Sequence, residues 1–178
     1  MQEKSCFGLF MKYASLNVLG MIALSCYILA DTFFVSLALG ANGLTALNLA
    51  IPVYSFINGS GLMIGMGGGI KYSILKSQGN RERGNQIFTN GAVMTAVIAG
   101  IFFLLGIFAA GPLIRLLGAD DTVYEMGKTY LRVILVFAPM FMTNNLLLCF
   151  IRNDGAPQLS MAAMIGGSLS NVVLDYVF

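Results

Sequence analysis

The stretch from Tyr13 to Leu39 is a predominantly apolar run of membrane-spanning length whose only charged residue is Asp31. A helix needs roughly 20 apolar residues to cross the hydrocarbon core of a bilayer, so this run predicts a transmembrane helix. An ionised Asp near the middle of such a helix costs about 2.5–3.5 kcal/mol and usually marks an ion, proton or substrate path. The alternative is an Asp neutralised by hydrogen bonds from neighbouring helices.

The composition extends this interpretation to the whole chain. Hydrophobic residues make up 57% of the 178 residues and charged residues only 10%, with a mean hydropathy of +0.81. Such a composition excludes a soluble domain and predicts an all-α, polytopic helix bundle in a lipid bilayer. The net charge of +2 is spread among connections, which argues against a nucleic-acid partner.

The residue types present restrict the chemistry. Histidine is absent, so proton chemistry would have to use carboxylates. The three cysteines, Cys6, Cys26 and Cys149, have no CxxC spacing, which argues against a disulfide framework or a zinc site. No Ser or Cys nucleophile stands beside a base. The sequence therefore predicts neither an enzyme nor a bound cofactor.

Hydropathy and turn residues predict five membrane-spanning helices with short connections, none long enough for a soluble domain. The expected spans are residues 13–39, 44–70, 88–110, 126–150 and 158–178.

The distribution of Lys and Arg predicts the orientation, because cytoplasmic connections carry an excess of these residues. Seven fall on the side of the N-terminus and three on or near the other side, so we expect a cytoplasmic N-terminus in the plasma membrane. The seven are Lys4, Lys12, Lys71, Lys76, Arg81, Arg83 and Arg152, and the three are Arg115, Lys128 and Arg132.

Three local patterns carry further expectations. Gly61, Gly65 and Gly69 recur at a spacing that lets a neighbouring helix approach closely. The cluster 65–69 lacks the Gly-Lys-Ser/Thr ending of a phosphate-binding loop and lies in an apolar run, so nucleotide binding is not expected. Thr122 and Glu125 match a capping box at the start of the fourth span.

A second carboxylate lies in the fifth span, where Asn171 and Asp175 occupy one helix face at i and i+4. Asp31 lies 19 residues after Lys12 and Asp175 lies 18 after Pro157, so both acids should reach the same depth on helices that run the same way. Tyr130, near the start of the fourth span, should lie close to that level, and Tyr27 lies on the same face of its helix as Asp31. Asn145 should lie nearer the cytoplasmic end of the fourth span. Oxygen ligands that carry negative charge suit Na⁺ or a shuttled proton. When two carboxyl groups lie close together, the charge of one raises the pKa of the other.

These residues also carry a resemblance that covers nearly the whole chain. The segments that carry it are 30–32 (Ala-Asp-Thr), 51–53 (Ile-Pro-Val), 117–119 (Leu-Gly-Ala), 130–132 (Tyr-Leu-Arg), 152–157 (Arg-Asn-Asp-Gly-Ala-Pro) and 171–176 (Asn-Val-Val-Leu-Asp-Tyr). In this order they resemble the N-terminal part of a multidrug and toxic compound extrusion (MATE) transporter.

The resemblance implies twelve helices in two pseudo-symmetric lobes, of which residues 1–178 would form the N-terminal lobe, truncated before its sixth helix. It implies a Na⁺- or H⁺-coupled antiporter of cationic or amphipathic drugs, with Asp31, Asn171 and Asp175 at the cation site. Tyr130 and Asn145 match supporting positions in that family. The alternatives are a lipid or lipid-linked precursor flippase of the same superfamily and a non-transporting membrane scaffold.

Overall fold

Helices account for every regular element that the structure describes. The computed structural model describes residues 6–177, and the side chains of several residues within its helices lie outside this description, among them Tyr27, Asp31, Asn171 and Asp175. The predicted all-α bundle is confirmed for the described residues.

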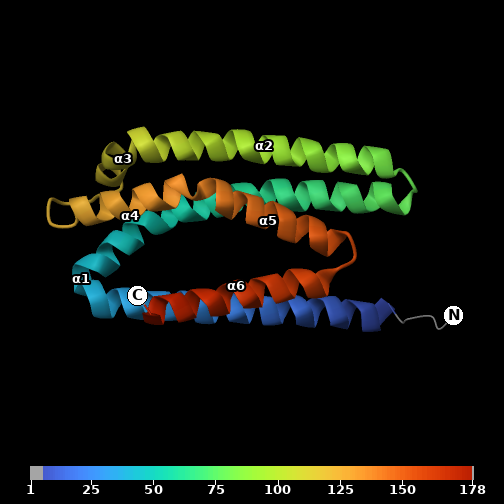
Figure 1. Ribbon diagram of the computed structural model, residues 1–178, viewed down its shortest axis with the longest axis horizontal. Coiled ribbons are helices and arrows are strands. Elements are labelled where there is room, and N and C mark those ends of the chain that lie inside the picture. Colours follow the sequence, from blue (N-terminus) through green and yellow to red (C-terminus); the bar gives the residue numbers. More distant parts are fainter. Residues whose placement is uncertain (1–5, 178) are drawn as a thin grey trace.

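The first helix, α1 (Cys6–Ser77), turns back on itself at Gly40, so that it forms two arms (Figure 1). Gly40 is its one residue with non-helical angles, at φ 62° and ψ −152°. A positive φ is readily adopted only by glycine. We call residues 6–39 the first arm and residues 41–77 the second arm. Pro52 lies inside the second arm without interrupting the helix.

The second helix, α2 (Arg81–Phe108), returns alongside the second arm after a tight turn (Figure 1). The turn contains Gly79 at φ 77°, and the Asn80 side chain caps α2 by accepting a hydrogen bond of 3.2 Å from the Arg83 N–H. A short helix, α3 (Ala110–Leu116), follows where the sequence predicted only a connection.

The expected fourth span consists of two helices, α4 (Tyr124–Val136) and α5 (Ala138–Asn153), bent by 44° at Phe137. Pro139 stands in the first turn of α5. A proline in the middle of a helix removes one backbone hydrogen bond and clashes with the preceding turn, which accounts for the break.

The predicted capping box at residues 122–125 is wrong. The α4 helix starts at Tyr124 without a side-chain cap, and the turn before it is held by Asp120 instead. The Asp120 Oδ1 accepts hydrogen bonds from the Thr122 hydroxyl (2.6 Å) and from the backbone N–H groups of Thr122 and Val123 (both 3.1 Å). These bonds, led by the one from the Thr122 hydroxyl, lower the pKa of Asp120.

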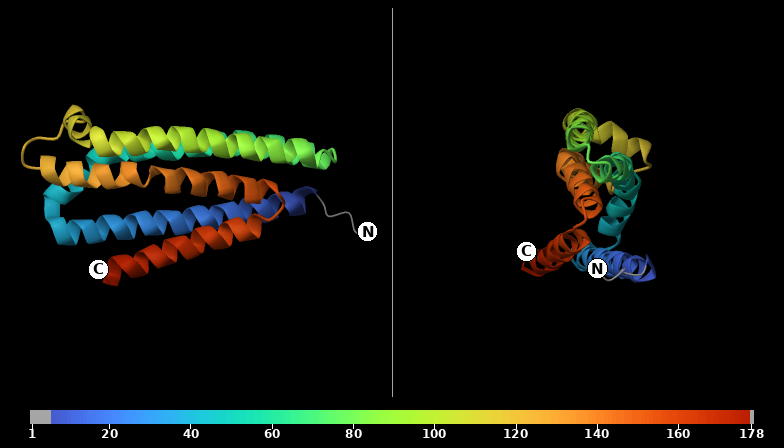
Figure 2. Two further views of the ribbon diagram at one scale, coloured as in Figure 1. Left: turned by 45° about the horizontal axis from the view of Figure 1, so that its top comes forward. Right: turned by 90° about the vertical axis from the view of Figure 1, so that its right-hand side faces the viewer.

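The last helix, α6 (Pro157–Val177), lies beside the first arm and runs in the same direction (Figures 1 and 2). It begins at Pro157, one residue before the expected start of the fifth span, after a turn in which Gly155 has φ 98°. The first arm and α6 form a pair that lies apart from α2, α4, α5 and the second arm (Figure 2).

The main buried core lies among the second arm, α2, α3, α4 and α5. Its fully buried large side chains are Ile57, Ile114, Leu131, Leu135 and Met142. The described residues of this core cluster all fall between Ala50 and Phe150, so none of them comes from the side chains described in the first arm and α6.

The predicted close approach at the glycine stripe is confirmed, and the approaching helix is α5. A Cβ added at Gly61 would lie 3.0 Å from the Met142 Cα, and one at Gly65 would lie 3.1 Å from the Asn145 carbonyl oxygen. At Gly69 the corresponding distance to the Asn153 Nδ2 is 2.8 Å. Side chains larger than glycine at these positions would push the two backbones apart.

The outer faces of the helices are strongly apolar. Phe56, Leu37 and Phe108 expose 73%, 69% and 78% of their surface, as expected for side chains in contact with lipid. By length and composition, two helical stretches in the described part could cross a membrane, Leu39–Ser77 and Arg81–Phe108, and α4 with α5 would form a third.

Candidate transport site

The backbone positions of the two acids lie on the adjacent, parallel helices of the first arm and α6 (Figure 1). Their side chains, like those of Tyr27 and Asn171, lie outside the described residues. The relative register of the two helices is given by Gly20, because a Cβ added there would lie 3.4 Å from the Met164 sulfur and methyl carbon.

This contact relates positions 31 and 175. Asp31 is 11 residues after Gly20, and Asp175 is 11 residues after Met164. Eleven residues make about three full turns and roughly 17 Å of rise, so each position returns to the face of its helix that carries the contact. The two positions therefore share one level, to within about a turn, while the helices diverge toward that end (Figure 2).

A cavity of about 320 Å³ lies between the first arm and the main bundle. Its wall from the first arm includes Ile28 and Thr32, so it adjoins the backbone of Asp31. The remaining lining residues come from the second arm, α4 and α5 and are mostly apolar or aromatic: Leu47, Ile51, Tyr54, Ser55, Tyr130, Ile134 and Phe141.

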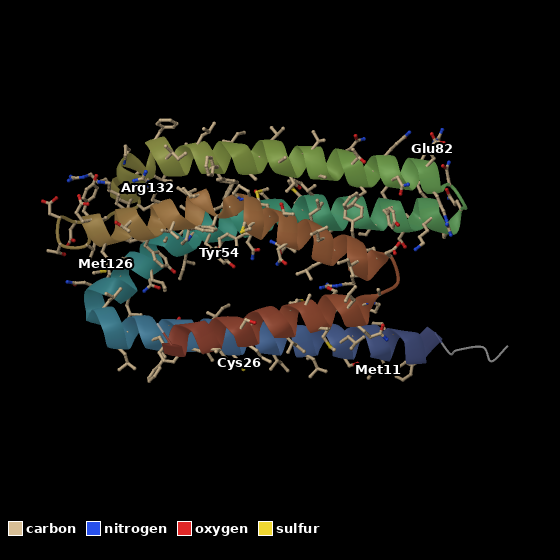
Figure 3. All side chains as sticks on the ribbon, in the orientation of Figure 1. Met11, Cys26, Tyr54, Glu82, Met126 and Arg132 are labelled. Carbon is tan, nitrogen blue, oxygen red and sulfur yellow. The ribbon has the colours of Figure 1, made fainter. Side chains whose placement is uncertain are left out.

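Two aromatic rings build one wall of this cavity. Tyr54 and Phe141 meet edge to face with ring centroids 5.5 Å apart, and Tyr54 is labelled in Figure 3. Tyr130, predicted from the sequence as a supporting residue, is half-buried and lines the same cavity as Thr32. Such a site offers ring faces and hydroxyl groups to a ligand, a combination suited to a flat, amphipathic molecule.

Asn145, the other supporting candidate with a described side chain, pairs with Asn58. Its Nδ2 donates to the Asn58 side-chain oxygen and, at 3.4 Å, to the Asn58 backbone carbonyl. This pair links α5 to the second arm inside the bundle, so the Asn145 amide serves a helix–helix contact in this structure. Its membership of a cation site stays a prediction.

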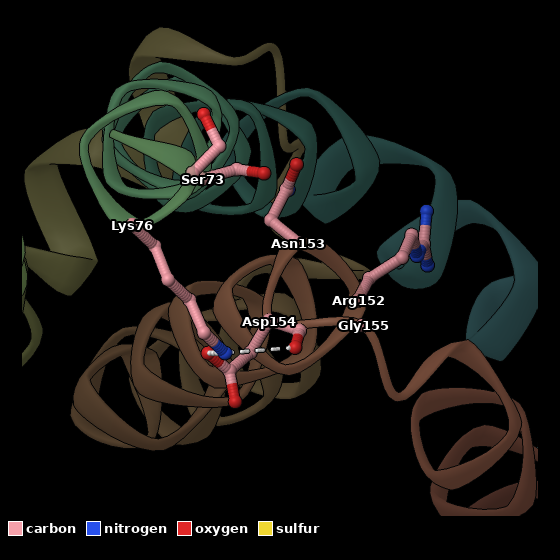
Figure 4. Close-up of a pocket in the computed structure, with 7 residues that line it drawn as sticks. Ser73, Lys76, Arg152, Asn153, Asp154 and Gly155 are labelled. Atoms are coloured by element: carbon pink, nitrogen blue, oxygen red, sulfur yellow. Dashed lines mark hydrogen bonds and ion pairs between the residues drawn. The ribbon is translucent and has the colours of Figure 1, made fainter. Parts of the chain in front are cut away.

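A polar cluster closes the end of the bundle where α1 meets the turn between α5 and α6. The Asp154 Oδ1 accepts hydrogen bonds from the Lys76 ammonium (2.5 Å) and the Tyr72 hydroxyl (2.7 Å). The Lys76 contact is the main reason why the pKa of Asp154 lies below its usual value. Figure 4 shows Lys76 and Asp154, with Arg152 directed away from them. The Arg152 guanidinium instead approaches the Met164 sulfur at 3.9 Å.

Metal binding by the described side chains has no support. No three His, Cys, Asp or Glu side chains lie close enough together to hold a metal ion in the described part of the chain, which does not include the carboxyl groups of Asp31 and Asp175.

Sequence reasoning did not identify several residues of these sites. Asn58 was detectable, since it is an amide inside the apolar run 44–70, where polar side chains commonly bond across helices. Asp154 was interpreted only as part of a turn. Nothing local to Lys76 or Tyr72 indicated that they would meet a residue about 80 positions away.

Comparison with known families settles what kind of protein carries this arrangement. The family model described as MatE matches residues 17–177. The chain belongs to the MatE family. Among its relatives is the multidrug export protein MepA of Staphylococcus saprophyticus, 24% identical over 99% of this chain and 39% of the relative. Another is a FAD transporter of Shewanella oneidensis, 27% identical over 89% of this chain and 35% of that protein.

Solved MATE structures share the fold. The MATE multidrug transporter DinF-BH, solved as a complex with a ligand, has a TM-score of 0.90 and 26% identity, and the match covers all of this chain and 40% of that one. A MATE in complex with MaD3S has a TM-score of 0.83 and 28% identity over 90% of this chain and 36% of that one. The chain spans about two fifths of the length of these MatE relatives. Its family and its apolar helices indicate a multi-pass membrane protein, and the relatives named here are transporters.

Proposed function

We propose that the protein is a secondary active antiporter that exports cationic or amphipathic drugs in exchange for Na⁺ or H⁺. In this proposal residues 1–178 form the N-terminal lobe, its N-terminus faces the cytoplasm from the plasma membrane, and the C-terminal lobe belongs to the same protein. The coupling ion binds at Asp31, Asn171 and Asp175.

The register between the first arm and α6 is the observation that carries the proposal. The Gly20–Met164 contact and the two equal intervals of 11 residues support a common level for the two acids. Two carboxylates at one level in a low-dielectric interior repel each other, so a bound Na⁺ or a shared proton stabilises them and their titrations are coupled.

The cavity next to Thr32 supports a link between the ion and the drug. It adjoins the backbone of Asp31 and carries the aromatic rings of Tyr54 and Phe141 and the phenol of Tyr130. A flat cationic drug in such a cavity lies beside the backbone of Asp31, and in this proposal its binding and the binding of the coupling ion disfavour each other. Tyr27, Tyr130 and Asn145 are the supporting residues of this proposal.

The membrane potential supplies driving force for such an exchange. An inward-moving cation gains about 2.3 kcal/mol per charge per 100 mV, enough to drive an uphill step of drug export.

The MepA relatives favour drug export, since several of them are described as multidrug export proteins. The Shewanella relative, a FAD transporter, favours a second candidate, the transport of FAD. A lipid or lipid-linked precursor flippase and a non-transporting scaffold are the remaining alternatives. An export assay with ethidium, FAD and a fluorescent lipid precursor as separate substrates distinguishes all four.

The test is a transport assay in vesicles that contain the complete natural protein, with an imposed Na⁺ or H⁺ gradient. Asp31→Asn and Asp175→Asn should each reduce gradient-driven ethidium export by more than about tenfold, because each removes a charge from the coupling site. The double variant should be no worse than either single variant, as expected for one titrating unit.

Asp121→Asn provides the matched control, since Asp121 is an exposed carboxylate paired with Arg115 at 3.3 Å in a surface turn. Membrane abundance is measured for every variant. Normal gradient-driven export by both single variants would make the two acids structural and place the coupling site elsewhere.

A further inference from the structure

Two adjoining cavities form a groove of mixed polarity at the end of the bundle where Lys and Arg concentrate. One, of about 330 Å³, is lined by polar residues that include Lys76 and Arg81. The other, of about 360 Å³, is lined largely by apolar residues that include Phe88, Leu147 and Leu159. They share Tyr72, Asn85 and Asp154, so they form one continuous groove, here called the α2–α5 groove.

The polar part of the α2–α5 groove has a positive balance of charge. Lys76 and Arg81 face one carboxylate, Asp154, which leaves a net charge of +1. Lys76 is engaged with Asp154 at 2.5 Å, whereas the Arg81 guanidinium has no hydrogen bond or ion pair with the side chains that the structure describes. Glu82, the next residue, lies on the outer side of α2 (Figure 3). Arg81 is therefore the cation available to a ligand.

The apolar part lies farther from the end of the bundle. Phe88 is seven residues into α2 and Leu147 is six residues before the end of α5, which places both roughly 10 Å along the helices. Their exposed fractions are 36% and 42%, and that of Leu159 is 59%, so these side chains form an accessible surface. A headgroup layer about 5–8 Å thick separates water from hydrocarbon in a bilayer, which matches this sequence of polar and apolar walls.

We propose that the α2–α5 groove binds an anionic phospholipid from the leaflet on the Lys/Arg-rich side of the protein. The phosphate contacts Arg81 and the free face of the Lys76 ammonium, and one acyl chain lies along Phe88, Leu147 and Leu159. A zwitterionic lipid gains the apolar contact but less of the charge interaction, so the site prefers an anionic headgroup. The lipid fills the space between α2, α5 and the start of α6, and thus stabilises the junction at Asp154.

The experiment is native mass spectrometry of the complete natural protein, titrated with dioleoylphosphatidylglycerol and, separately, dioleoylphosphatidylcholine. The wild type should retain phosphatidylglycerol more strongly. Arg81→Gln should reduce this preference about fivefold, the effect of one basic residue at a membrane surface. Arg83→Gln is the matched control, because two residues farther along α2 the side chain points to a different face of the helix.

The apolar part is tested with Leu147→Trp, which fills the groove. It should weaken retention of both lipids, and thermal unfolding in detergent verifies that the variant is folded. Glycerol 3-phosphate, the headgroup without chains, should not displace the lipid at equal concentration. Three outcomes would each overturn the proposal. Arg81→Gln and Arg83→Gln could have equal effects, or glycerol 3-phosphate could displace the lipid. The wild type could also show no lipid preference because a later segment of the protein covers the groove.

Discussion

The Lys76 ammonium and the Asp154 carboxylate lie 2.5 Å apart, although 78 residues separate them in the sequence. Lys76 lies in the last turn of the second arm of α1, and Asp154 begins the turn into α6. The same ammonium donates to the Asp154 backbone carbonyl at 3.2 Å, so one side chain holds both the charge and the backbone of the turn. This pair fixes where α6 begins relative to the main bundle.

Replacing Asp154 should therefore lower thermal stability in detergent. The Lys76 and Asp154 side chains are 39% and 46% exposed, so we expect Asp154→Asn to cost about 1 kcal/mol or less after solvent screening. Asp121→Asn, which breaks the more exposed pair with Arg115, should change stability less. Equal losses for the two variants would contradict a special role for Asp154.

The same pair predicts a dependence on pH. The pKa of Asp154 is lowered from 3.8 in the folded protein, first by the Lys76 hydrogen bond and then by that of Tyr72. Its contribution to stability is therefore complete above pH 3.8 and is lost as the pH falls through the lowered value. The difference in melting temperature between wild type and Asp154→Asn should be constant from pH 5 to 7 and shrink in acid. A difference that grows in acid would have the wrong sign.

The contact between the second arm and α5 should be intolerant of side chains at Gly65. A Cβ there would meet the Asn145 carbonyl oxygen and the Cys149 side chain at 3.1 Å, whereas one at Gly67 would meet no atom within 4 Å. We expect Gly65→Leu to destabilise the protein by about 1–3 kcal/mol, the usual cost of overpacking. Gly67→Leu is the matched control, and thermal unfolding of both in detergent provides the measurement.

Asn58 and Asn145 should be energetically coupled. Replacing either one with Leu leaves the other, partly buried amide without its partner, whereas the double replacement removes both. A double-mutant cycle on thermal stability should give a coupling of about 0.6–1.7 kcal/mol, the range measured for bonds between membrane helices. A coupling of zero would mean that each amide finds another partner.

Labelling from outside the cell should distinguish the two ends of the bundle. Ser77 and Thr122 are both exposed; Ser77 is the last residue of the second arm and Thr122 precedes α4, at the opposite end of the bundle (Figure 1). In a background in which Cys6, Cys26 and Cys149 are replaced, Thr122→Cys should react with an impermeant thiol reagent and Ser77→Cys should not. The reverse result would overturn the proposed orientation.

The sequence predicted the elements whose signals are local. Turn residues and hydropathy were sufficient to predict the start of α6 to within one residue, and the spacing of Gly61, Gly65 and Gly69 predicted close helix contact. The break at Phe137 was missed although Pro139, within the apolar run 126–150, was a local sign of it. The capping box failed because the Asp120 Oδ1 accepts hydrogen bonds from the Thr122 hydroxyl and the Thr122 backbone N–H, the two Thr122 groups that the box would have used.

Contacts between distant segments were beyond the reach of sequence reasoning. The meeting of Tyr72 with Asp154 depends on the lengths of four helices and the angles between them, none of which a local pattern encodes. The cavity beside Thr32 likewise requires the first arm, α4 and α5 to be placed together. The proposed cation site at Asp31, Asn171 and Asp175 comes from the sequence and the resemblance, and the Gly20–Met164 register supports only that positions 31 and 175 share a level.

The reversal at Gly40 bears on how the protein enters its membrane. Because one residue joins the two arms of α1, there is no loop for the insertion machinery to translocate between them. We therefore expect the two arms to enter the bilayer in one step, joined through Gly40. An epitope tag spliced in at residue 40 would divide this step in two, whereas the same tag between α1 and α2 would leave it intact.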